Sequence, residues 1–177
     1  MSEKELQRLR REIDRIDAGI ISLLNRRMKT SARIGARKKQ LGRAAYDPSR
    51  EKEILARLKS LNRGQLPAPG IDFIFGEIIS ACRSAFRPIR VAYSGPAPGS
   101  GRTAGINNFG RSARFLACSG NPGVFRALQS GRADYGIVTD PGEITVFPPG
   151  LKVVKNGTLP GRAGKKEKFV VLRGRGG

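Results

Sequence analysis

The sequence contains no histidine and no tryptophan, and only two of its 177 residues are cysteines. The absence of histidine removes the commonest general base, and it excludes Ser-His triads and most metal sites. Cys82 and Cys118 are isolated, with no C-x-x-C pair, which is typical of unpaired thiols in a reducing compartment. We therefore expect a site that uses neither a metal nor a cofactor.

Long apolar runs and acidic residues are scarce as well. No apolar run approaches eighteen residues, and the N-terminus is charged where a signal peptide would be apolar, so we expect a cytoplasmic protein that does not enter a membrane. Lys and Arg number 34 against 14 Asp and Glu, a net charge of +20. That charge favours an anionic partner: a nucleic acid, an anionic surface or an anionic small molecule.

The stretch from Leu6 to Lys39 contains no proline and repeats its apolar residues every three or four positions, which predicts one helix about 50 Å long. The apolar positions are Leu6, Leu9, Ile13, Ile16, Ile20, Leu23 and Ile34. A helix of this length needs packing partners along its whole extent. We expect a second copy of the chain beside it.

Two cations interrupt the apolar face of this helix. Arg27 falls where the next apolar residue belongs, and Lys38, eleven residues later, lies on nearly the same face. They could form the solvated end of an imperfect stripe, because long cationic side chains can reach water. Alternatively an anion meets them, since buried cations cost free energy unless they are paired. Arg10 lies about 100° from the face of Arg27, a direction that allows it to reach a neighbouring subunit.

Two more helices follow before the composition changes. Asp47 and Pro48 predict a helix start, because Asp caps N-termini and Pro suits the first helical position. The third helix is predicted over 71–86 and ends at Pro88. Residues 1–87 hold six glycines and three prolines, whereas residues 88–177 hold seventeen and eight. We therefore divide the chain into a helical part, 1–87, and a second part, 88–177.

The second part predicts a small α/β lobe. Short apolar runs at 89–93, 115–118, 135–138 and 169–172 are typical of strands, and 124–130 of a helix that ends at Gly131. Alternation of strand and helix indicates an α/β unit. The basic tail, 173–177, is predicted to be disordered.

The helical part resembles the all-helical class of chorismate mutases over residues 6–86. The resemblance rests on Leu9-Arg10, Arg27, Lys38 and the run Tyr-Asp-Pro-Ser-Arg-Glu at 46–51. It implies a three-helix, all-α domain in which two chains interlock through the first helix. The implied reaction converts chorismate to prephenate in the biosynthesis of phenylalanine and tyrosine. This unimolecular rearrangement needs a compactly held dianion and positive charge at the breaking ether bond, but no nucleophile, metal or proton transfer.

The resemblance also implies roles for three cations. Arg10 resembles the arginine that one chain donates to the site of its partner. Arg27 resembles the arginine that binds a substrate carboxylate from within the same chain. Lys38 resembles the lysine that reaches a carboxylate and the ether oxygen of the breaking bond.

The remaining site residues follow in the second and third helices. Asp47 and Glu51 resemble the groups at the ring hydroxyl, and Arg50 resembles a further site arginine. Cys82 lies where the family that the chain resembles has a small residue, often Ser, near a substrate carboxylate. Phe86 departs from the family, which has Gln or Glu there facing the ether oxygen. Because Phe cannot donate a hydrogen bond, and one such donor can contribute about 10²–10³ in rate, we expect weak activity.

The second part resembles the first lobe of a prephenate dehydratase domain, which follows this type of mutase in bifunctional enzymes. The matching runs are 91–96 and 125–138. The family's Pro-Ile-Glu-Asn-Ser is replaced at 139–143, its catalytic Thr-Arg-Phe becomes Glu-Lys-Phe at 167–169, and its substrate-facing loop is altered at 97–102. These changes imply a truncated dehydratase lobe without dehydratase activity. With no regulatory domain after it, we expect no feedback by phenylalanine.

Two other functions remain open. Phe86 is compatible with an isochorismate-pyruvate lyase, or a related dianion rearrangement on the same fold. The net charge and the Arg-Gly tail are compatible with a basic nucleic-acid-binding or scaffold protein. The sparse aromatic residues and the lack of a binding motif weigh against nucleic acid.

Overall fold

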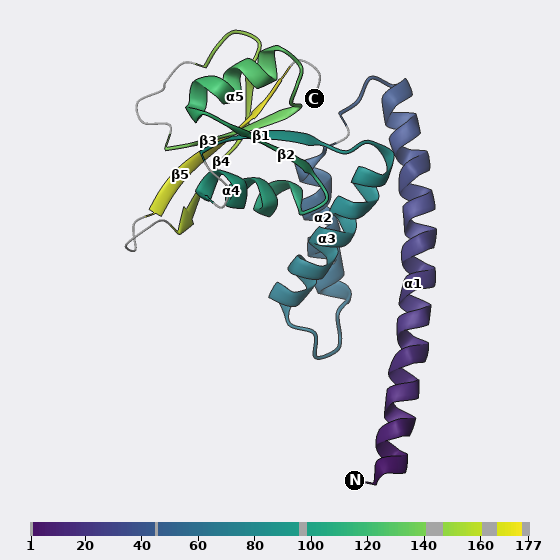
Figure 1. Cartoon of the computed structure of the whole chain (residues 1–177). Helices are drawn as coiled ribbons and strands as arrows, with labels where there is room; N and C mark the ends of the chain where they lie inside the picture. Colours follow the sequence, from purple (N-terminus) through teal and green to yellow (C-terminus); the bar gives the residue numbers. More distant parts are fainter. Residues whose placement is uncertain (1, 45, 96–98, 141–146, 161–165, 175–177) are drawn as a thin grey trace.

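The computed structural model describes residues 2–44, 46–95, 99–140, 147–160 and 166–174 (Figure 1). Helices come first, followed by a mixed α/β region, as the sequence predicted. The elements are α1 (Glu3–Gln40), α2 (Pro48–Leu61), α3 (Ala68–Phe86), β1 (Arg90–Ser94), α4 (Ser100–Phe109), β2 (Arg114–Cys118), α5 (Gly120–Gln129), β3 (Tyr135–Thr139), β4 (Lys152–Pro160) and β5 (Lys166–Arg173). In the part of the chain that is described, no helix has the length and apolarity that crossing a membrane requires.

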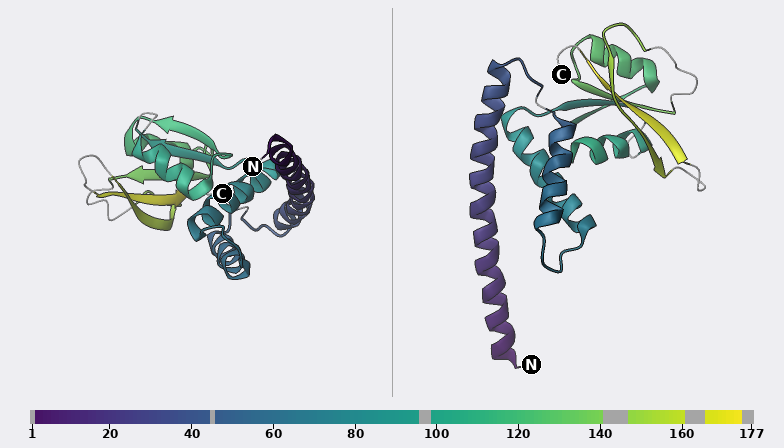
Figure 2. Two further views of the ribbon diagram at one scale, coloured as in Figure 1. Left: turned by 90° about the horizontal axis from the view of Figure 1, so that it is seen from below. Right: turned by 180° about the vertical axis from the view of Figure 1, so that it is seen from behind.

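Helix α1 is 38 residues long and has no buried residue. Ser2 caps it by accepting the Glu5 N–H at 3.3 Å, and three basic residues in its last turn suit the negative end of the helix dipole. Its C-terminal half lies beside α3, while its N-terminal half extends past the rest of the chain (Figures 1 and 2). Among the described residues, the apolar face of this N-terminal half therefore has no packing partner.

Helices α2 and α3 complete the helical part. Asp47 is the N-cap of α2 and accepts the Arg50 N–H at 3.1 Å, with Pro48 in the first turn, as predicted. Helix α3 contacts both α1 and α2. The buried residues of α3 are Ile71, Ile79, Ser80 and Cys82.

The α/β region is a five-stranded mixed sheet in the order β2-β1-β3-β5-β4. Strand β1 is parallel to β2 and β3, while β5 is antiparallel to β3 and β4. Helices α4 and α5 cover opposite faces of the sheet (Figure 1). Alternate residues of β1 face the two helices: Val91 packs on the α4 side and Ala92 on the α5 side.

The buried carboxylate of Asp134 joins the end of α3 to this sheet. It accepts the Arg90 backbone N–H at 2.9 Å and the Arg90 Nη2 at 2.8 Å, and Arg87 Nη2 lies 2.9 Å away. Burial raises the pKa of Asp134, but the hydrogen bonds and charge of Arg90 outweigh burial, and the pKa lies below its usual 3.8.

Helix α4 and strand β4 were not predicted. Residues 97–102 were assigned to a loop, but α4 begins at Ser100, and residues 97 and 98 lie outside the described part. Helix α4 lacks an apolar stripe because small residues pack it against the sheet: a Cβ on Gly105 would lie 2.7 Å from the Phe115 ring. Strand β4 is largely exposed at the sheet edge, so it carries little apolar signal.

The predicted disorder of the basic tail is wrong at its start. Arg173 is the last residue of β5, and Gly174 is buried, with its N–H donated to the Asp134 carbonyl at 3.0 Å. Backbone pairing with β3 therefore extends the ordered chain further than composition indicated. Residues 175–177 lie outside the described part.

Candidate active site

Seven of the eight residues that the sequence singled out line one cavity of about 490 Å³ between α1, α2 and α3. They are Arg27, Lys38, Asp47, Arg50, Glu51, Cys82 and Phe86. They come from three helices and the residue that caps α2, so tertiary packing brings together positions up to 59 residues apart, from Arg27 to Phe86.

The cations of α1 face this cavity, as the helical spacing predicted. Arg27 has a buried Nη1 with no hydrogen-bond partner among the described residues. A buried, unpaired guanidinium nitrogen is costly, and an anion in the cavity would satisfy it. Lys38 lies on one side of the same cavity, and its Nζ is 3.5 Å from Asp47 Oδ2.

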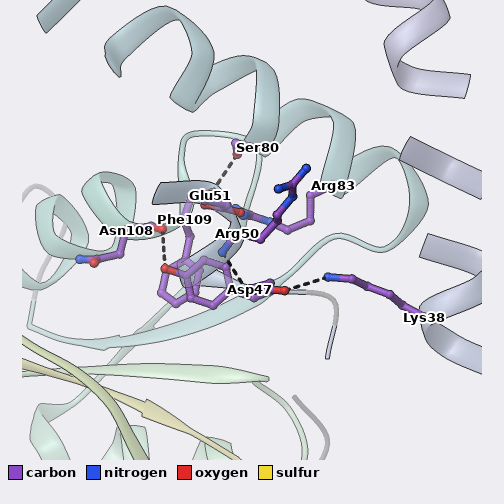
Figure 3. A network of polar contacts seen from close by, with 9 residues as sticks. Lys38, Asp47, Arg50, Glu51, Ser80, Arg83, Asn108 and Phe109 are labelled. Carbon is purple, nitrogen blue, oxygen red and sulfur yellow. Dashed lines mark hydrogen bonds and ion pairs between the residues drawn. The ribbon is translucent and has the colours of Figure 1, made fainter. Parts of the chain in front are cut away.

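Helix α2 contributes acidic groups from its first turn, where backbone N–H groups favour negative charge. Asp47 caps the helix, and Glu51 follows one turn later, ion-paired with Arg83 of α3 (Figure 3). Burial raises the pKa of Glu51 above its usual 4.5, although Arg83 and Lys38 act in the opposite direction. Arg50 borders the cavity but is exposed, and its Nη1 pairs with Glu53 at 2.9 Å.

Helix α3 supplies the apolar wall. Cys82 is 3% exposed, and the Phe86 ring packs closely against α1 at Gly35: a Cβ on Gly35 would be 2.6 Å from Phe86 Cδ1. Phe86 therefore occupies the cavity wall near Arg27 and Lys38, and its ring offers them no hydrogen bond.

Arg10 is the one predicted residue outside this cavity. It is exposed on the N-terminal half of α1, seventeen residues before Arg27, which corresponds to about 25 Å along the helix axis. Within one chain it cannot reach the cavity.

Arg83 was missed by the sequence analysis. Its side chain is 8% exposed, and it borders the cavity beside Glu51. The signal was present, because Phe75, Ile79 and Arg83 follow one another at four-residue spacing on α3. A cation that continues an apolar stripe is the same signal that drew attention to Arg27.

The charges of the lining favour an anion. Four cations (Arg27, Lys38, Arg50, Arg83) stand against two carboxylates (Asp47, Glu51), a difference of +2. Within the described ranges, no group of three or more His, Cys, Asp or Glu side chains is placed to hold a metal ion. The cavity can therefore bind a small anion and place positive charge against it without a metal contributed by these residues.

Comparison with known proteins gives the same picture for the helical part. Residues 9–85 match the family Chorismate mutase type II. The bifunctional chorismate mutase/prephenate dehydratase of Aquifex aeolicus is 42% identical over 76% of this chain and 38% of its own length. The protein of the same description from Neisseria gonorrhoeae is 37% identical over 71% of this chain and 34% of its own length.

A solved structure, chorismate mutase (form II) from Thermus thermophilus, is 39% identical over 45% of this chain and 91% of that chain, with a TM-score of 0.44. The chain spans less than two fifths of the length of the two bifunctional relatives. The chain thus contains a helical chorismate mutase type II domain at residues 9–85, with a small mixed α/β region after it.

Proposed function

We propose that the chain is a chorismate mutase, which rearranges chorismate to prephenate in the cavity between α1, α2 and α3. The observation that carries the proposal is the buried, unpaired Nη1 of Arg27 in a cavity whose lining is net positive. The family match over residues 9–85 supports the same activity. Chorismate is a dianion, so it supplies the negative charge that this lining lacks.

In this proposal the cavity works by holding the substrate and by electrostatics. Arg27 binds one carboxylate, and Lys38 reaches a carboxylate and the ether oxygen, where negative charge develops as the bond breaks. Asp47 and Glu51 lie at the ring hydroxyl, whose single O–H donates to one of the two carboxylates, while Arg50 and Cys82 border the bound dianion. Fixing the compact conformer removes the entropic cost of reaching it during the reaction. Phe86 leaves the ether oxygen with Lys38 as its one cationic neighbour, so turnover is slow.

The site also requires a second chain in this proposal. The apolar face of α1 is exposed, with Ile16 55% and Leu23 66% accessible. A stripe of that size on a helix whose N-terminal half extends away from the rest of its own chain suits a second copy of the same helix. In such a homodimer Arg10 of the partner subunit would complete the cation set of each cavity.

For the α/β region we propose a truncated dehydratase lobe without dehydratase activity. The relatives named above as bifunctional support its origin. Glu-Lys-Phe at 167–169, where the family has Thr-Arg-Phe, supports the loss of activity. The altered segment 139–143 adds to this, although 141–143 lie outside the described residues.

We also propose a cytoplasmic location, since Cys82 and Cys118 are both free thiols.

The test is loss of chorismate absorbance with the purified full chain. Arg27→Ala should lower kcat/KM by about 10²-fold or more, because it removes the guanidinium whose buried Nη1 has no partner among the described residues and which would bind the substrate. Arg33→Ala is the matched control, since Arg33 is exposed on the same helix and does not border the cavity. Full activity in Arg27→Ala would exclude this site. If the wild type leaves chorismate intact but converts isochorismate, the lyase reading that Phe86 keeps open is correct.

A further inference from the structure

Arg83 joins three parts of the molecule at one point. Its Nη1 is ion-paired with Glu51 of α2, and its Nη2 donates to the backbone carbonyl of Phe109 at 2.6 Å (Figure 3). Its Cζ lies 5.2 Å from the centroid of the Tyr46 ring. These three contacts hold the guanidinium in a single orientation with both terminal nitrogens engaged.

The last turn of α4 supplies the acceptors for this contact. The Phe109 carbonyl also accepts from Ser80 Oγ at 2.8 Å, and the Asn108 carbonyl accepts from the Tyr46 hydroxyl at 3.2 Å. The last carbonyls of a helix have no partner inside the helix and carry the negative end of its dipole. The α/β region therefore presents one carbonyl acceptor and negative partial charge to Arg83, and a second carbonyl acceptor to Tyr46.

The loop that leads into α2 is anchored in the same place. Tyr46 is 8% exposed and belongs to the core on the α4 side of the sheet. Its ring centroid is 4.8 Å from that of Phe109 and 5.4 Å from that of Tyr135. Since Tyr46 directly precedes Asp47, the N-cap of the helix that carries Glu51, the α/β core also fixes where α2 begins.

We propose that Arg83 is a positioning residue for the Glu51 carboxylate, and that the end of α4 holds Arg83, so that the α/β region completes the cavity of the helical domain. The inference rests on the proposed mutase function and deepens it. It gives residues 88–177 a role that does not depend on turnover by the dehydratase lobe.

The environment of Glu51 explains why it needs this support. It is faced by Arg83 from α3, Lys38 from α1, and Asp47 and Tyr46 from the start of α2. Lys38 lies beside Asp47 at 3.5 Å, so Arg83 is the cation that pairs directly with Glu51. Without Arg83 the buried carboxylate would lie beside the like charge of Asp47, and burial would favour its protonated form more strongly. It would also lose the contact that aims it into the cavity.

The first experiment titrates Glu51 directly in the full-length protein. Carbon-detected NMR of its side-chain carboxyl, assigned with Glu51→Gln, is recorded for the wild type and for Arg83→Met. The proposal expects the pKa of Glu51 to rise in Arg83→Met, and kcat/KM to fall by up to about 10²-fold, the loss that small misplacement in a preorganised site can cause. The acidic limb of the pH-rate profile should move to higher pH with it. Arg83→Lys, which keeps one donor, should give a smaller shift, and it serves if Arg83→Met does not fold.

The second experiment moves α4 without changing any residue of the cavity. Gly110 has φ +72, and a Cβ there would lie 2.3 Å from Ser80 Cβ, so Gly110→Ala pushes the end of α4 away from α3. Gly131→Ala is the matched control, because Gly131 has φ +70 but nothing within 4 Å of the added Cβ. Both variants carry the same backbone strain. Gly110→Ala alone should raise the pKa of Glu51 and lower kcat/KM.

The same pKa of Glu51 in the wild type, Arg83→Met and Gly110→Ala would overturn the proposal, whatever the rate of turnover. A protein that leaves chorismate intact but shows the predicted shifts would overturn the mutase function and still support the coupling. If the pKa of Glu51 rises in Arg83→Met but not in Gly110→Ala, then α4 does not hold Arg83 in place. The proposed role of the α/β region would then be wrong.

Discussion

The two regions of this chain differ in how far they bury their apolar residues. In the α/β region, β1 and β3 are covered on both faces, and Val91, Ile137 and Val138 are completely inaccessible. In α1, which has a regular apolar stripe over most of its length, no residue is buried. The α/β region therefore completes its core within one chain, whereas the helical region leaves its longest apolar surface exposed, which is the surface that we propose a second copy covers.

The proposed chemistry and the ion pairs that stabilise the fold also lie in different regions. The cavity belongs to the incomplete, helical region, and two of its four cations, Arg27 and Lys38, come from the exposed α1. The buried ion pairs of Asp134 belong to the complete region and to the joint between the two. Three predictions test the comparison.

The largest effect is expected on α1. The double change Ile16→Asp and Ile20→Asp should abolish association and turnover, because a dimer through this face buries four isoleucine side chains that are about half exposed in the single chain. Their burial contributes roughly 3–6 kcal/mol by transfer. Light scattering after size exclusion measures the mass. Arg11→Asp, on the opposite face of α1, is the control and should remain dimeric. A double variant that keeps the wild-type mass would show that this stripe is not the interface.

An intermediate effect is expected on the α/β region. Asp134→Asn should lower the free energy of unfolding at neutral pH by about 2 kcal/mol, because the buried side chain loses its charge-assisted hydrogen bonds to Arg90 and Arg87, which are themselves about half exposed. The exposed Asp140→Asn is the control and should unfold as the wild type does.

The pH dependence of this effect has a definite sign. The folded-state pKa of Asp134 lies below its usual 3.8, so its contribution is fully present above the unfolded pKa and is lost as pH falls through the folded pKa. The difference in free energy of unfolding between the wild type and Asp134→Asn, measured by urea unfolding, should decrease below about pH 4. A difference that stays constant to pH 2 would show that the ion pairs do not stabilise the fold.

The smallest effect is expected within the cavity. Phe86→Gln should raise kcat/KM for chorismate about tenfold, since it restores a donor beside the ether oxygen, where one donor can contribute about 10²–10³. Part of that gain is offset because the Phe86 ring packs on Gly35 and its removal loosens the wall. Phe73→Gln, at an exposed position of α3, is the control. An unchanged or slower Phe86→Gln would show that Phe86 does not limit the reaction.

Much of the site could be predicted because it lies on helices with strong periodicity. Arg27 and Lys38 share a face at eleven-residue spacing, and Asp47-Pro48 marks the start of α2 by local capping chemistry alone. Arg83 was missed even though it extends the stripe of α3, since its importance comes from Glu51 and from the Phe109 carbonyl, neither of which is near it in sequence. Helix α4 was missed because its glycines signal a loop until the strand beside them is known.

Local sequence alone determined the three helices, the apolar stripe of α1 and the position of each cation around the helix axis, because helical periodicity and capping depend on residues within a few positions of one another. Tertiary structure alone decided that Arg27 Nη1 is buried without a partner, that Phe86 lies on Gly35, and that the end of α4 meets Arg83. Those facts depend on burial and on contacts between residues twenty-six or more positions apart, which no local pattern encodes.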